Sequence, residues 1–106
     1  SLALVAAEAA LSDKDHMMKS LKMNSEQKMV LYKGLEDLSY QYIPSAGNFI
    51  CFDCNQDAKE KFNELLKEGV IVRSMGVYNM PNHLRVTIGL PRENSVFLEK
   101  LTKLKG

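Results

Sequence analysis

Three arginines are the residues of this chain best suited to chemistry. Arg73, Arg85 and Arg92 fall within one stretch of twenty residues, and two of them interrupt segments that are otherwise apolar, VIVR (70–73) and LRVTIG (84–89). A guanidinium is planar, permanently charged and able to form two parallel hydrogen bonds with a carboxylate or a phosphate. If the two segments are paired strands, Arg73 and Arg85 project near the loop that joins them and form an anion site.

A plainer interpretation of these arginines is that each forms an ordinary ion pair. Asp53 and Glu93 are acidic residues that could lie at the sheet edge beside them. Surface ion pairs are common and contribute little to stability. Spacing alone leaves both interpretations open.

The two cysteines form a C-x-x-C pattern, at Cys51 and Cys54. A redox pair places its first cysteine at a helix N-terminus, where the thiol pKa is lowered, whereas Cys51 lies inside a predicted strand. Residues three apart on a strand point to opposite faces, and no second cysteine pair or histidine cluster completes a zinc site. We therefore expect no metal site and two small, buried or half-buried cysteines, and we expect His16 and His83 to be solvated or structural.

The elements that would position these residues predict an α+β fold, a small sheet of about four strands covered by helices. Ser12 and Asp13 carry the signals of a helix start, Asn55 can cap another helix, Gly69 fits its left-handed C-terminal cap and Pro91 fits the start of the last helix. The expected elements are helices at 2–11, 12–38, 55–68 and from 91 onward, and strands at 40–43, 48–54, 70–73 and 84–89.

A stripe of large apolar residues at helical spacing marks the second helix. Methionine at such spacing most often packs in a core, although an adaptable binding surface is the alternative use. We take the core interpretation for Met17, Met18, Leu21, Met29, Leu31, Tyr32, Leu35 and Leu38.

Length and charge bound the remaining possibilities. The 106 residues suit one compact domain, residues 1–106, and the formal charge of +1 lacks the basic excess of a nucleic-acid binder. No apolar run approaches the roughly 20 residues of a membrane span, and the start is not that of a signal peptide, so a cytoplasmic location is expected. The apolar stretch 2–11 predicts a helix buried against other structure, as in a piece of a longer chain.

Three segments resemble one enzyme family over nearly the whole chain. PSAGNFI (44–50), EGVIVRSMGVYNMPNHLRVTIGLPREN (68–94) and SLALVAAEAALSD (1–13) are similar to the C-terminal small domain of histidinol-phosphate aminotransferases, which are fold-type I pyridoxal-phosphate enzymes. On this resemblance, residues 1–11 are the end of an inter-domain helix. The full-length enzyme is implied to be a homodimer whose large domain holds pyridoxal 5'-phosphate.

The resemblance also implies roles for three residues. Arg85 matches the arginine that holds the substrate α-carboxylate, and Arg73 matches one that contacts the substrate phosphate. Asn48 lies in a motif that faces the active-site cleft, without an assigned ligand contact. The implied reaction belongs to histidine biosynthesis and transfers an amino group between glutamate and imidazole acetol phosphate.

The Schiff-base lysine and the other cofactor residues of the family belong to the large domain, which would precede Ser1. The chain alone is therefore expected to carry no catalytic residue, bind no cofactor and be inactive. Two alternatives remain: a free-standing anion-binding or regulatory module without catalysis, or the small domain of a related aminotransferase or of phosphothreonine decarboxylase.

Overall fold

The computed structural model describes the backbone of residues 2–105 and the side chains of residues 14–76 and 78–105. Within that range the chain forms an α+β domain, as predicted. The helices are α1 (Leu2–Asp37), α2 (Ala58–Lys67) and α3 (Pro91–Lys105), with a short 3-10 turn, η1 (Gly76–Tyr78). The strands are β1 (Tyr42–Ile43), β2 (Phe49–Asp53), β3 (Arg73–Ser74) and β4 (His83–Thr87).

The four strands form one antiparallel sheet in the order β1-β2-β4-β3. Side chains alternate between the two faces of a strand, and one face of this sheet is fully apolar. Ile50 and Phe52 of β2 and Leu84 and Val86 of β4 all point to that face, and each is buried. This alternation fixes which residues enter the core and which do not.

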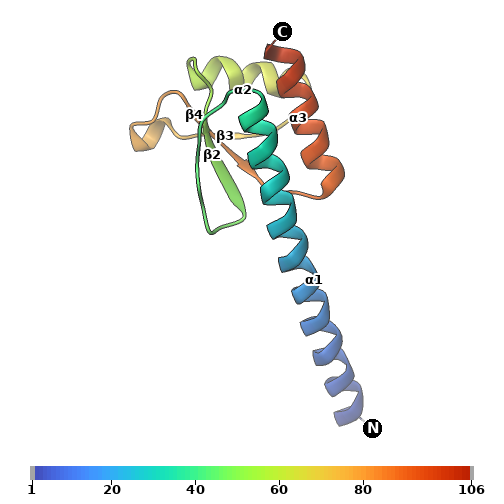
Figure 1. Ribbon diagram of the computed structural model, residues 1–106. Coiled ribbons are helices and arrows are strands. Elements are labelled where there is room, and N and C mark those ends of the chain that lie inside the picture. The colour runs from blue at the N-terminus through green and yellow to red at the C-terminus, as the bar shows by residue number, and fades with distance from the viewer. Residues whose placement is uncertain (1, 106) are drawn as a thin grey trace.

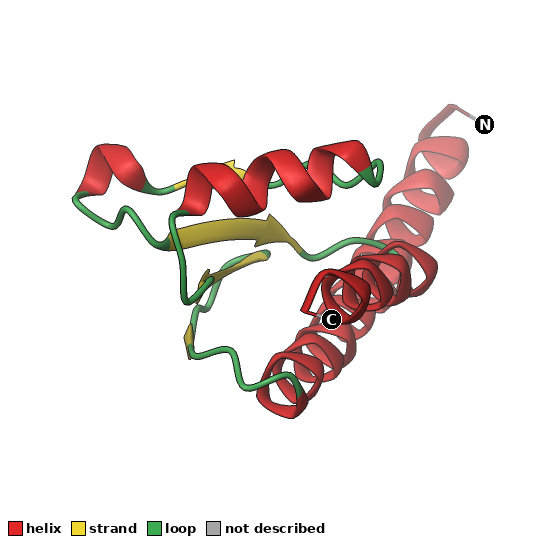
Figure 2. Cartoon of the chain, turned by 90° about the horizontal axis from the view of Figure 1, so that it is seen from above, coloured by secondary structure: helices red, strands yellow, loops and turns green. Residues whose placement is uncertain are grey.

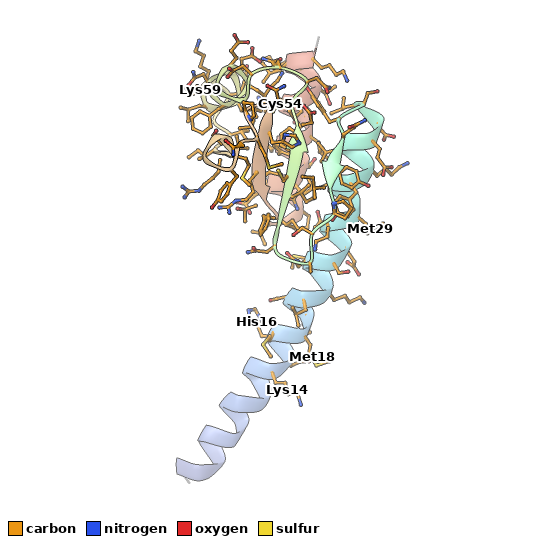
Figure 3. All side chains as sticks on the ribbon, turned by 90° about the vertical axis from the view of Figure 1, so that its left-hand side faces the viewer. Lys14, His16, Met18, Met29, Cys54 and Lys59 are labelled. Atoms are coloured by element: carbon orange, nitrogen blue, oxygen red, sulfur yellow. The ribbon has the colours of Figure 1, made fainter. Side chains whose placement is uncertain are left out.

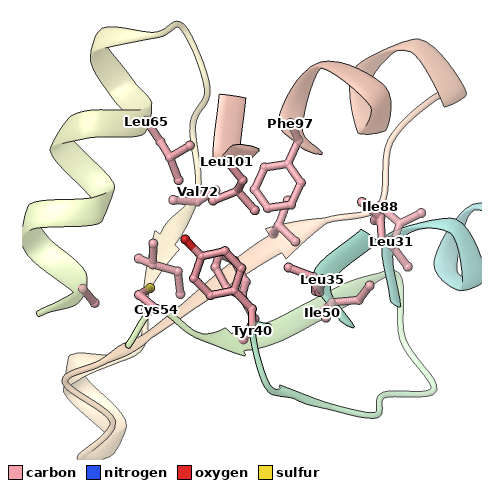
Figure 4. Packing of buried hydrophobic residues seen from close by; sticks show 14 residues of the cluster. Leu31, Leu35, Tyr40, Ile50, Cys54, Leu65, Val72, Ile88, Phe97 and Leu101 are labelled. Atoms are coloured by element: carbon pink, nitrogen blue, oxygen red, sulfur yellow. The ribbon is translucent and has the colours of Figure 1, made fainter. Parts of the chain in front are cut away.

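All three helices contribute to a single core on this face of the sheet (Figure 4). Phe52 lies at its centre and meets the rings of Tyr40 and Phe97 edge-on, each with 5.8 Å between ring centroids. Leu35 of α1 and Leu65 of α2 are fully buried in the same cluster. Figure 2 shows α1 and α3 together on one side of the strands. The helices therefore cover one face of the sheet and leave the other face free.

The predicted helix boundary at Ser12 is wrong, because α1 runs without a break from Leu2 to Asp37. Serine and aspartate favour caps, but they are also tolerated inside a helix when the backbone bonds continue past them. Residues 2–11 are helical, as expected. The prediction that their side chains are buried concerns side chains outside the described residues. The N-terminal half of α1 projects away from the sheet and gives the molecule extents of 59 × 27 × 25 Å (Figure 1).

The core interpretation of the methionine stripe is wrong for its first half. Met17, Met18, Leu21 and Met29 are 57 to 64% exposed, whereas Leu31 and Leu35 are fully buried. Thirty-six residues of helix measure about 54 Å, and the sheet and α3 reach only the C-terminal part of that length. Helical spacing identifies one face of α1 but not how far its partner extends. Lys14, His16 and Met18 lie on the projecting part (Figure 3).

The other element ends differ by a few residues from their predictions. α2 is capped by Asp57, whose Oδ1 accepts a hydrogen bond from the Lys59 N–H at 2.8 Å, and not by Asn55. The left-handed conformation predicted for Gly69 is confirmed by its φ of +83°, and Pro91 opens α3 as predicted. No helix in the described part of the chain is long and apolar enough to cross a membrane.

Candidate anion-binding site

The sheet face opposite the core carries the side chains of β2 and β4 that alternate with the core residues. Phe49, Cys51 and Asp53 alternate with the core residues of β2, and they lie opposite Thr87, Arg85 and His83 of β4. The described helices all pack on the other face. Since none of the described helices covers this open face, a second molecule or another part of a protein can reach it.

Arg73 and Arg85 are direct partners across β3 and β4. Directly opposed residues of an antiparallel pair point to the same face, with their Cβ atoms about 5 Å apart. The strand pairing that the sequence suggested therefore exists and brings both arginines together on the open face. Two like charges at this spacing repel each other, so an anion between or beside them relieves an unfavourable contact.

The ion pairs weighed as an alternative do not form among the described side chains. None of the described ion pairs involves Arg73, Arg85 or Arg92. Asp53 accepts a hydrogen bond from the Asn55 N–H at 2.8 Å, and Glu93 accepts one from the Leu90 N–H at 2.8 Å. Each carboxylate therefore binds a backbone N–H of a neighbouring residue and not an arginine, which favours the anion-site interpretation.

Arg85 has an unsatisfied hydrogen-bonding atom. Its Nε is buried and has no hydrogen-bond partner among the described residues. The side chain as a whole is half-buried, and its Cζ lies 5.1 Å from the centroid of the Phe49 ring. A buried donor without a partner costs roughly 1 to 3 kcal/mol, and such groups are rare in folded proteins, so this atom marks Arg85 as an unusual residue of the sheet.

Arg92 and Asn48 lie outside this arginine pair. Arg92 is exposed in the first turn of α3 and lines a separate open cleft of about 520 Å³ beside Val70 and Phe97. Asn48 precedes β2, and its backbone oxygen accepts a hydrogen bond from the Ile88 N–H at 2.7 Å. Its side chain is exposed next to Phe49. A ligand contact of Asn48 remains a prediction.

The residue that sequence reasoning missed is Phe49. The sequence pattern places Phe49 only within the strand predicted at 48–54, whereas its alternation with the core residue Ile50 puts it on the open face. Phe49 opposes Thr87, and Cys51 opposes Arg85, so Phe49 and Arg85 are diagonal neighbours. Aromatic and long side chains reach each other across that diagonal. Reading the register of the two strands together would have found the contact.

Cys51 completes a row with the two arginines, since it is the partner of Arg85 on the β2 side. Burial raises the pKa of the Cys51 thiol, and the nearby Arg85 charge opposes part of that rise. Burial also raises the pKa of Cys54, to about 12. Both cysteines are free and buried, as predicted. Neutral thiols of this kind are poor nucleophiles.

The two histidines and the acidic side chains form no further candidate site among the described residues. His16 is exposed on the projecting part of α1, and His83 is half-buried opposite Asp53. Within the described residues, no three histidine, cysteine or acidic side chains gather in a way that could hold a metal ion. The open face is therefore a candidate site for an anion, with two paired guanidinium groups and one aromatic ring.

Comparison with known proteins identifies the family of this chain. Residues 1–101 match the family model of aminotransferases of class I and II. The chain belongs to the class I and II aminotransferase family. It is 53% identical over 104 residues to histidinol-phosphate aminotransferase 2 of Pseudomonas fluorescens, and 44% identical over 106 residues to histidinol-phosphate aminotransferase 1 of Idiomarina loihiensis.

A solved relative shares the fold of this aminotransferase chain. The histidinol-phosphate aminotransferase of Sinorhizobium meliloti, crystallised with pyridoxal-5'-phosphate, superposes with a TM-score of 0.75 over 93% of this chain and 29% of that one, at 24% identity. The matches to the two sequence relatives cover 98% and 100% of this chain. They cover only 28% and 29% of the relatives' own lengths. The chain thus spans less than a third of each of these proteins.

Proposed function

We propose that this chain is the substrate-binding, C-terminal small domain of a histidinol-phosphate aminotransferase, with the N-terminal part of α1 as a portion of an inter-domain helix. The reaction exchanges the amino group of glutamate for the carbonyl oxygen of imidazole acetol phosphate, giving 2-oxoglutarate and histidinol phosphate. The observation that carries the proposal is the direct pairing of Arg73 and Arg85 on a free sheet face without acidic partners. The similarity to enzymes of that name supports the choice of substrate.

The two arginines would hold different anionic groups. Arg85 lies in the middle of β4, which is bonded on both sides by β2 and β3, so its backbone is rigid. This rigidity suits the α-carboxylate of the amino donor, since a bidentate pair needs a fixed fork. Arg73 lies in the two-residue edge strand β3, directly before the loop that contains η1. We assign Arg73 to the phosphate group, which only the imidazole substrates carry.

The described residues near the arginines do not include a lysine that could bind pyridoxal phosphate. An aminotransferase binds this cofactor through a lysine beside its substrate, and the cofactor supplies the electron sink of the reaction. All eleven lysines of this chain lie on α1, α2 and α3, whose buried sides meet the core face of the sheet. None lies on the open face with the arginines. We therefore assign the cofactor to a large domain of the same protein, in a cytoplasmic homodimer, and derive no chemical step from this chain.

The decisive experiment uses the full-length protein that contains this chain. The purified protein, reconstituted with pyridoxal phosphate, is mixed with glutamate and imidazole acetol phosphate, and 2-oxoglutarate is measured. We expect turnover that is saturable in both substrates, and none from residues 1–106 alone. Preferred turnover of an aromatic 2-oxo acid, or release of CO₂ from phosphothreonine, would instead assign a related branch of the family. Anion binding by a protein without any turnover would favour a regulatory module.

A further inference from the structure

The contact between Phe49 and Arg85 has no place in the reaction proposed above, which concerns the arginines alone. The guanidinium carbon of Arg85 lies 5.1 Å from the centroid of the Phe49 ring. That separation is within the range of about 6 Å in which a cation is attracted to an aromatic face. Among the described residues this ring is the one partner of the guanidinium, because no carboxylate pairs with it and its Nε has no hydrogen bond.

Phe49 also contacts the loop that precedes β2. A Cβ atom on Gly47 would come within 3.0 Å of Cε1 of Phe49, so the ring lies directly against the backbone there. The Gly47 N–H donates to Oγ of Ser45 at 3.1 Å, and the Ser45 N–H donates to the Tyr32 hydroxyl of α1 at 3.1 Å. Lys28 of α1 also donates to the Ser45 carbonyl oxygen, at 2.5 Å. The ring is therefore supported through this loop by α1.

An arginine on a sheet face without an acidic partner ordinarily samples many rotamers. Binding an anion then requires the side chain to be ordered, which weakens the observed affinity. A fixed ring against one side of the guanidinium removes part of that freedom in advance. With Nε buried, the terminal nitrogens of this half-buried side chain are the atoms left to meet a ligand.

We propose that Phe49 is a positioning residue for Arg85: its ring fixes the guanidinium on the open face so that the terminal nitrogens are ready to bind the carboxylate of the amino donor. The proposal rests on the function proposed above, because it takes the ligand of Arg85 to be that carboxylate. Phe49 does not touch the substrate in this scheme and acts only through Arg85.

The test compares Phe49→Leu and Phe49→Tyr in the full-length enzyme. Leucine keeps apolar bulk and removes the aromatic face, whereas tyrosine keeps that face. We expect Phe49→Leu to raise the KM for glutamate about three- to tenfold with little change in kcat, and Phe49→Tyr to stay near wild type. Phe62→Leu is the matched control, since Phe62 lies on α2 and packs against the core side of the sheet. It should leave the KM for glutamate unchanged.

A double-mutant comparison separates positioning from a merely structural role. If Phe49 acts through Arg85, the effect of Phe49→Leu on the KM for glutamate should largely disappear in an Arg85→Lys background. An equal effect in both backgrounds, or no effect of Phe49→Leu in an enzyme that loses glutamate binding with Arg85→Lys, would overturn the proposal and leave the proposed function intact.

A second measurement needs no activity. Phenylglyoxal modifies accessible guanidinium groups, and mass spectrometry locates the modified residue. Arg85 should be modified several-fold faster in Phe49→Leu than in wild type, while exposed Arg92 reacts at the same rate in both and serves as the internal control. Equal rates at Arg85 would refute the positioning role even if the protein proved to have no aminotransferase activity.

Discussion

The Glu68 carboxylate at the end of α2 accepts a hydrogen bond from the Lys103 ammonium of α3, with 2.7 Å between Oε1 and Nζ. Lys100 lies 3.4 Å from the other carboxylate oxygen. The Lys103 hydrogen bond holds the pKa of Glu68 below its ordinary value of 4.5, with partial burial opposing it and Lys100 adding to it. This cluster links α2 to α3 beside the core, on the side of the sheet away from the arginines.

The pH dependence of stability should reveal this link. A carboxylate whose pKa is lowered by folding contributes stability that is present above its unfolded pKa and is lost as the pH falls through its folded pKa. We therefore expect the free energy of unfolding in urea to fall between pH 5 and pH 3, and to fall less steeply in Glu68→Gln. Glu99→Gln is the control, because Glu99 forms none of the described ion pairs. Identical pH profiles for Glu68→Gln and wild type would contradict the link.

The cysteines should resist thiol reagents while the protein is folded. Burial raises the pKa of Cys54 from its ordinary value of 9.0 to about 12, so its thiol stays protonated near pH 8, and burial also limits access of the reagent. Cys51 is buried as well, and burial raises its pKa. Ellman's reagent at pH 8 should therefore react slowly with the native protein and release two equivalents after unfolding in guanidinium. Rapid reaction of one thiol in the native state would indicate an activated cysteine.

The sequence predicts some of the helix ends and the approximate positions of the strands well. Gly69 and Pro91 end and begin helices as predicted, because left-handed backbone and a missing N–H each suit one position. The strands were found near their predicted places, although β3 covers only Arg73–Ser74 and not residues 70–73. The apolar run VIV predicts extended chain, but it does not decide how many of its residues bond to β4.

Tertiary relationships were the part that local patterns could not supply. The spacing of Met17 and Leu35 is equivalent along α1, yet only Leu35 meets the sheet. The contact of Phe49 with Arg85 depends on the register between β2 and β4, which no single segment contains. The pairing of Arg73 with Arg85 is predictable, in contrast, because one loop joins the two strands that carry them.

The centre of the core should be sensitive to truncation. Phe52 is fully buried and packs edge-on against Tyr40 and Phe97, so Phe52→Ala removes both ring contacts and leaves a cavity. We expect a loss of about 3 to 5 kcal/mol in the free energy of unfolding, measured by urea denaturation. Ile71→Ala is the control, since Ile71 is 78% exposed and should change stability by about 0.5 kcal/mol or less. Equal losses for the two variants would contradict the assigned core.

If Arg73 and Arg85 bind different anionic groups, substitutions of the two arginines should affect the two half-reactions of the full-length enzyme differently. Arg73→Ala should weaken the reaction with histidinol phosphate by about 1.5 to 3 kcal/mol, the worth of one charge-assisted hydrogen bond, and change the glutamate reaction much less. Arg85→Lys should weaken the glutamate reaction, because an ammonium cannot reproduce the bidentate geometry, and also the histidinol phosphate reaction if that phosphate reaches Arg85. Arg92→Ala, outside the pair, should leave both half-reactions near wild type.

Single-turnover rates with each substrate test this assignment. Equal losses on both substrates for Arg73→Ala would refute the assignment of Arg73 to the phosphate.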